Sequence, residues 1–177
     1  MGSPAQGAQG SAAQPISESV TRLIGAMNAD TDLVMVALGA EAAAVAPAVW
    51  ALAAYVVEPG PDASEGEALR VSLREVLNRG RDAALVVALD HALGGDAPLA
   101  AAQVHRMVAA YCAAGDEVWA VAPEGGIGGY PVLLGRQIIE LFLRGTFQTA
   151  SELLSANRVH VLTLAAAGAG TAAVLPG

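Results

Sequence analysis

Lysine is absent from this chain of 177 residues: all nine basic residues are arginine, against 17 aspartate and glutamate residues. The resulting net charge of −8 argues against a general nucleic-acid-binding surface, which needs clustered cations. The absence of lysine also removes a side chain that commonly binds phosphate as a point charge. We therefore expect no nucleic-acid partner.

Cysteine is nearly absent, and with Cys112 alone the chain cannot form an internal disulfide. This favours a reduced, cytoplasmic setting. The first residues have neither the basic segment nor the apolar core of a signal peptide. The longest apolar stretch without charge, residues 42–57, contains Pro47 and is shorter than the roughly 18 residues that span a membrane. We expect no membrane segment.

Apolar residues are abundant, at 54% of the chain, and the length suits one domain with a proper core. Residues 1–15 consist mainly of glycine, alanine, glutamine, serine and proline without periodicity, which predicts a flexible tail. Residues 16–177 are then a single domain.

Extended and helical patterns alternate along this domain. Short apolar runs predict buried strands, and apolar residues three to four positions apart predict helices. We expect strands in residues 32–39, 53–58, 83–89, 116–123 and 159–164, and helices in residues 17–29, 40–50, 66–79, 100–114 and 149–155, with a further helix that Pro131 opens. This alternation predicts an α/β fold with a mostly parallel sheet.

The strand predicted at residues 83–89 ends directly before Asp90 and His91. Ligands of open α/β sheets bind beyond the carboxyl ends of such strands. An acid in this place could hold a metal ion or a phosphate-bound magnesium, and His91 could transfer a proton or contact a ligand. The alternative is that Asp90 only caps the next turn.

A glycine-rich loop follows the strand predicted at residues 116–123, with four glycines in residues 125–130. Glycines let the backbone approach a ligand closely. The loop lacks the Gly-Lys-Ser/Thr end of a P-loop, and it does not follow the first strand as a dinucleotide fingerprint would. A flexible connector is the alternative. Arg136 could meet a phosphate or be solvated, and Arg70 and Arg74 are expected on a solvated helix surface.

Several of these motifs, in this order, resemble the nucleotidyltransferase domain of molybdenum cofactor cytidylyl- and guanylyltransferases. The resemblance covers nearly the whole chain from Ser17 onward. Residues 1–4 are similar to the end of the family's signature loop, L-A-A-G-x-S-x-R-M-G-x-P-K, and residues 33–40 are similar to its second strand. The other matching pieces are Gly66 with Ser72-Leu73 (G-x-x-x-S-L in the family), residues 89–93 (G-D-Q-P-L or D-H-P-L) and residues 129–136 (G-H-P-V-L-x-x-R).

The resemblance implies a three-layer, Rossmann-like fold of the nucleotide-diphospho-sugar transferase type. It implies CTP or GTP and a molybdopterin-type acceptor as substrates, with Mg²⁺ as cofactor. By this carry-over, Asp90 would hold the metal and act in catalysis with His91. The nucleotide would contact Gly2, Ser3, Gly66 and Ser72, and the remaining cleft would be lined by Gly129, Tyr130, Pro131 and Arg136.

The sequence also departs from this family. The family's first strand and the L-A-A-G-x-S-x-R part of the loop are absent, Ala5 stands at the lysine position, and residues 172–176 replace the closing D-I-D-T-P. We therefore expect weak or no transferase activity. The missing strand is central in the family's sheet, so its neighbours would have unpaired edges. The alternatives are a non-catalytic scaffold that binds a partner or forms a homodimer, and a truncated form of an active enzyme.

Overall fold

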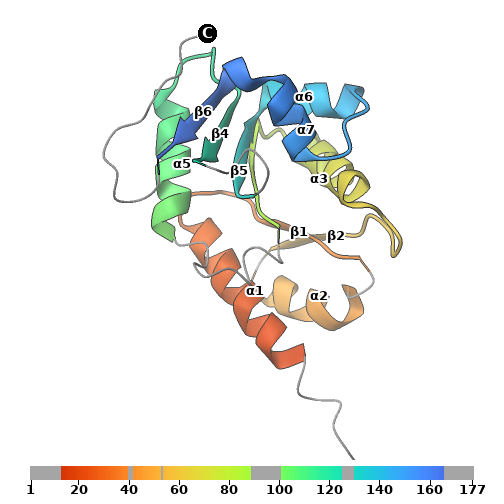
Figure 1. Ribbon diagram of the computed structural model, residues 1–177. Coiled ribbons are helices and arrows are strands. Elements are labelled where there is room, and N and C mark those ends of the chain that lie inside the picture. Colours follow the sequence, from red (N-terminus) through yellow and green to blue (C-terminus); the bar gives the residue numbers. More distant parts are fainter. Residues whose placement is uncertain (1–12, 40–41, 53, 89–100, 125–129, 166–177) are drawn as a thin grey trace, which may run out of the picture.

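The computed structural model describes residues 13–39, 42–52, 54–88, 101–124 and 130–165 (Figure 1). Its helices are α1 (Ala13–Asn28), α2 (Ala42–Ala51), α3 (Glu65–Asn78), α5 (Ala101–Ala113), α6 (Arg136–Arg144) and α7 (Ala150–Ala156). Its strands are β1 (Met35–Ala37), β2 (Tyr55–Val57), β3 (Ala83–Val86), β4 (Ala120–Pro123), β5 (Val132–Gly135) and β6 (Val161–Leu164), with a 3₁₀ turn at Arg158–His160. The predicted α/β class is confirmed.

The strands form two separate sheets. In the small sheet, β1 and β2 are parallel. The larger sheet has the order β3-β5-β4-β6, in which β4 and β6 are parallel and β5 is antiparallel to both of its neighbours. This sheet is mixed, where the sequence predicted a mostly parallel one. The reason lies in residues 124–131, because a parallel connection needs a dozen or more residues and this link is too short.

The helix predicted to begin at Pro131 is wrong for its first residues, which form β5. Val132, Leu133 and Leu134 are all buried, as a strand between two others requires. The helical spacing of Leu134 and Ile138 misled the prediction, because the strand passes directly into α6 at Arg136. Only glycine fits at Gly135, where a Cβ atom would lie 2.9 Å from the Tyr111 ring and 3.0 Å from the Trp119 carbonyl oxygen.

Helices cover both faces of the larger sheet, and two further helices cover the small one (Figure 1). Side chains of α3, α6 and α7 pack against one face in the largest core cluster, which includes Leu73, Leu134 and Phe142. On the other face, Met107 of α5 packs with Val121 and Leu133. Helices α1 and α2 close a separate apolar cluster over β1 and β2.

Arg70 fastens α3 to the end of α6. Its guanidinium donates hydrogen bonds to the carbonyl oxygens of Phe142 (3.1 Å), Gly145 (3.4 Å) and Phe147, and it lies 4.8 Å from the centre of the Phe142 ring. The Phe142 carbonyl is in the last turn of α6, where a helix leaves its carbonyl groups without helical partners, and Gly145 and Phe147 follow in the loop after it. The side chain is half-buried, so the expectation of a solvated arginine is wrong here.

Several element ends differ from the predictions. Helix α1 begins at Ala13, inside the segment predicted as a tail, and residues 1–12 lie outside the described part. Helix α3 begins at Glu65 after an N-cap at Ser64, whose hydroxyl accepts from Glu67 N–H while the Glu67 carboxylate accepts from Ser64 N–H. Within the described ranges, no helix is both long and apolar enough to cross a membrane.

Candidate functional site

Strand ends gather at one end of the larger sheet, which we call the carboxyl end. The pairing of Val86 with Val132 and of Pro123 with Leu164 brings the last residues of β3, β4 and β6 beside the first residue of β5. The chain leaves β3 here, four residues before Asp90. The carboxyl ends of sheet strands are where α/β proteins bind ligands, so this end of the sheet is the candidate site.

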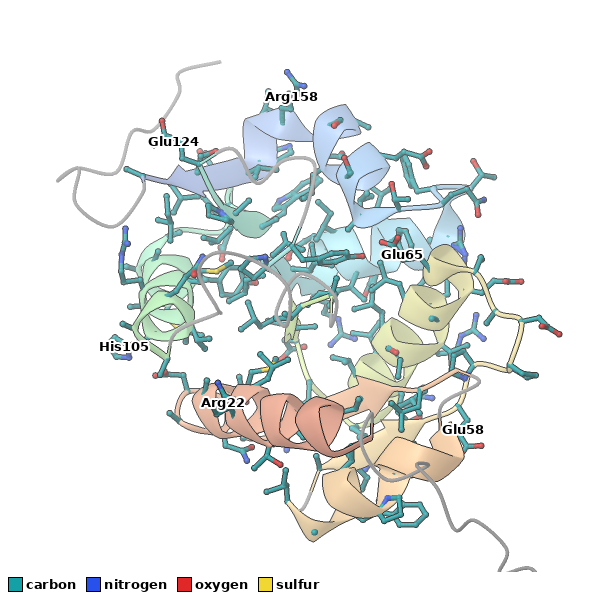
Figure 2. The ribbon with its side chains drawn as sticks, turned by 60° about the horizontal axis from the view of Figure 1, so that its bottom comes forward. Arg22, Glu58, Glu65, His105, Glu124 and Arg158 are labelled. Carbon is teal, nitrogen blue, oxygen red and sulfur yellow. The ribbon has the colours of Figure 1, made fainter. Side chains whose placement is uncertain are left out.

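Tyr130 stands at the carboxyl end, just before β5, and is held by α3. Its hydroxyl donates a hydrogen bond to Glu65 Oε1 at 2.7 Å. Glu65 begins α3 at the end of the helix that meets α6 and α7, as Figure 2 shows. Burial raises the pKa of Tyr130 well above its ordinary value, and the hydrogen bond and charge of Glu65 raise it further. Tyr130 is therefore a neutral hydrogen-bond donor at physiological pH.

Gly66 lies next to Glu65 and is buried against the loop between α6 and α7. A Cβ atom at this position would lie 3.0 Å from the carbonyl carbon of Gln148 and closer still to its oxygen. The close approach of two backbones explains a glycine at this position without a ligand. Its predicted contact with a nucleotide stays a prediction.

Ser72 and Arg136 lie apart from this group. Ser72 is six residues along α3 from Gly66, roughly 9 Å of helix, and its hydroxyl donates to the Ala68 carbonyl oxygen at 2.9 Å. Arg136 follows β5 at the opposite end of the sheet, so the four residues of the strand, roughly 13 Å, separate it from Tyr130. The structure thus brings together Gly66, Tyr130 and the adjacent Pro131, and leaves Ser72 and Arg136 at a distance.

Arg136 is paired within the protein. It donates to Asp82 Oδ1 at 2.6 Å and to Glu140 Oε1 at 3.0 Å. The hydrogen bonds to Asp82 and Glu140 raise its pKa, so the guanidinium stays charged. The side chain is 53% exposed, and its partners explain its position without a phosphate.

The remaining predicted residues, Gly2, Ser3, Asp90, His91 and Gly129, lie outside the described residues. In the part of the chain that the structure describes, no three His, Cys, Asp or Glu side chains come together as metal ligands. The predicted magnesium site at Asp90 therefore stays a prediction.

Sequence reasoning missed Glu65 as the partner of Tyr130. The two residues are 65 positions apart, and no local pattern connects them. The one available signal was Ser64, whose N-cap chemistry could have placed Glu65 in the first turn of α3. Glu65 also lies near the amino end of α3, where the helix dipole favours a negative charge.

The sequence matches no protein-family model and no curated protein.

Proposed function

We propose that this chain is a nucleotidyltransferase-like domain related to the CTP- and GTP-dependent molybdopterin nucleotidyltransferases, with little or no catalytic activity. One observation carries the proposal: the sheet is divided in two, and among the described strands nothing pairs with the second edge of β1 or of β3. By the resemblance, β1 and β3 correspond to the two strands that flank the family's central first strand, so the open edges lie where such a strand would pair.

The contacts around this division support the proposal. Arg81, two residues before β3, pairs with Asp32, three residues before β1, at 3.1 Å between Nη2 and Oδ2. Two strands that flank a third lie roughly 10 Å apart, a separation that the long arginine side chain can bridge. Helix α3 contacts both β1 and β3, so one helix covers strands of both sheets. The two sheets thus keep a shared covering layer.

The carboxyl end of the larger sheet carries a fixed hydrogen-bonded pair beside the position at which we propose that the nucleotide binds. Tyr130 and Glu65 hold each other, and the packing of Gly66 on Gln148 fixes the start of α3. The described residues do not by themselves fit a magnesium ion, because they include no cluster of ligands. A metal would depend on Asp90 and on the nucleotide phosphates.

Thermal unfolding of the purified chain with Mg–CTP and Mg–GTP tests this proposal. A nucleotide at about 100 times its dissociation constant should stabilise the native state by about 2.7 kcal/mol. For a domain of this size that is a rise of roughly 5–10 °C in the midpoint.

The rise should need magnesium and should disappear in Asp90→Ala. The exposed Asp116 provides the matched control, since Asp116→Ala should keep the full shift. A cooperatively folded chain with no shift for either nucleotide contradicts the proposal.

The same open edges favour a second function, a partner-binding subunit. Unpaired backbone groups along a strand edge are ready to pair with another chain. Size-exclusion chromatography with light scattering tests this. A stable homodimer or a co-purifying second chain supports it, and a monomer at all concentrations argues against self-association.

A further inference from the structure

A cavity of about 230 Å³ lies between α3 and β2, and we call it the α3–β2 groove. All three residues of β2, Tyr55 to Val57, line it, together with one face of the second half of α3 from Val71 to Arg79. Side chains of adjacent strand residues point to opposite faces, so the backbone of β2 borders the groove as well. Among the described strands, β2 has no neighbour on its second edge.

The rim of the groove carries hydrogen-bond donors that the described protein leaves unused. Arg74 is exposed and has no polar partner among the described residues. Arg79 donates a hydrogen bond from Nε to Glu75 at 2.8 Å, and its guanidinium lies 4.0 Å from the centre of the Tyr55 ring. Its two Nη groups have no acceptor among the described residues. The exposed Asn78 lies between these two arginines in sequence and also lines the groove.

The other lining residues of the groove are mostly apolar. Val57 is 9% exposed, and Val56 and Val71 are half-buried around the same space. Tyr55 is 46% exposed, although Arg79 lies over its ring. The groove therefore joins two cationic forks to an apolar surface, within a chain whose net charge is −8.

We propose that the α3–β2 groove binds a small organic oxyanion, with a carboxylate or phosphate head on Arg74 and Arg79 and a compact apolar body on the valines. Planar guanidinium groups hold such heads through paired hydrogen bonds. The volume equals that of roughly eight water molecules at about 30 Å³ each, which suits a single small ring and its head group.

Two electrostatic features of the groove weaken its general attraction for an anion. Glu75 lines the groove but is occupied by Arg79, so the charged groups of the lining sum to one positive charge. The groove lies toward the carboxyl end of α3, where the helix dipole opposes an anion. Binding must therefore depend on direct contact with the guanidinium groups, and loss of Arg74 should remove most of it.

This groove is separate from the carboxyl end of the larger sheet. Glu65 and Gly66 occupy the first turn of α3, and Arg74 to Arg79, the residue that ends the helix, lie two to nearly four turns further along, roughly 12–20 Å. The proposal therefore does not depend on the nucleotidyltransferase-like function.

Titration of ¹⁵N-labelled protein with phenyl phosphate tests the proposal, with phenylacetate as the carboxylate form of the same probe. We expect saturable amide shifts confined to Tyr55–Val57 and to the second half of α3, with a millimolar dissociation constant. Arg74→Gln should raise that constant at least tenfold. Raising the salt concentration from 50 to 500 mM should also weaken binding, because the head group is charged.

Arg158→Gln is the matched control, because Arg158 is also exposed and lies across the molecule from Glu58, the residue after β2 (Figure 2). This variant and Asp90→Ala should bind phenyl phosphate as the unmodified chain does, which separates this test from that of the nucleotide site. Inorganic phosphate should bind at least tenfold more weakly than phenyl phosphate. The proposal would be overturned by equal affinity for inorganic phosphate and phenyl phosphate, or by amide shifts at all the arginines of the chain. Equal losses of affinity in Arg74→Gln and Arg158→Gln would overturn it as well.

Discussion

Replacement of Arg70 should destabilise the joint between α3 and α6 far more than replacement of any exposed arginine. Arg70→Ala removes hydrogen bonds to the carbonyl oxygens of Phe142 and Phe147 and a contact with the Phe142 ring. Hydrogen bonds from a charged group contribute about 1.5–3 kcal/mol each when their acceptors are cut off from water. The ring contact adds about 0.5–1 kcal/mol. Because the Arg70 side chain is only half-buried, water replaces part of these interactions in the variant. We therefore expect Arg70→Ala to lower the free energy of unfolding by about 2–4 kcal/mol.

Urea unfolding followed by far-ultraviolet circular dichroism measures this change. At an unchanged slope of about 2 kcal/mol per molar urea, the midpoint should fall by about 1–2 M. Arg70→Lys keeps the charge but loses the planar fork, so it should restore less than half of the stability.

Arg74, one turn further along α3, has no described polar partner and is the matched control. Arg74→Ala should change stability by less than about 0.5 kcal/mol. Equal effects of Arg70→Ala and Arg74→Ala would refute the assignment of Arg70 as the residue that holds α6.

Two further predictions concern the start of α3 and the carboxyl end. Gly66→Ala should lower stability by about 1–3 kcal/mol, because the new methyl group meets the backbone of Gln148. Gly25→Ala in α1, where the added atom meets nothing within 4 Å, should stabilise by about 0.5–1 kcal/mol; matching thermal midpoints for the two variants would contradict this. Burial and Glu65 raise the pKa of Tyr130 in the folded state above its value in the unfolded chain. The protonated hydroxyl therefore makes its full contribution to the free energy of unfolding below pH 10, and this contribution is lost as the pH rises above that value. Urea unfolding between pH 8 and 11 should therefore show a steeper loss for the unmodified chain than for Tyr130→Phe, and parallel curves would argue against the raised pKa.

The order of helices and strands could be predicted because it depends on local periodicity. The apolar runs before Gly39 and before Asp90 and the helical face of Leu69, Leu73 and Val76 each produced an element of the predicted type. The exception was β5, where an apolar strand passes into an amphipathic helix without a turn. There, Val132 to Leu134 satisfied both periodicities, and only pairing with β3 and β4 decided between them.

The candidate site could be predicted only in part. Tyr130 and Gly66 were singled out by resemblance, and the structure brings them to one end of the sheet, whereas Arg136 lies at the other end with Asp82 and Glu140. The strand β5 causes this separation, because Tyr130 precedes it and Arg136 follows it, and the two ends of a strand lie at opposite ends of the sheet. Asp90 and His91 lie outside the described residues, so their roles stay predictions.

The sequence by itself determined the composition of the core and the alternation of helices and strands, since these depend on residue types and their spacing along the chain. Tertiary structure alone decided the burial of Arg70, the pairing of Tyr130 with Glu65 and the groove between α3 and β2. Each of these arises from contacts between residues far apart in the sequence, such as Arg70 with Phe142. Local patterns carry no information about such contacts, because they form only when separate elements pack together.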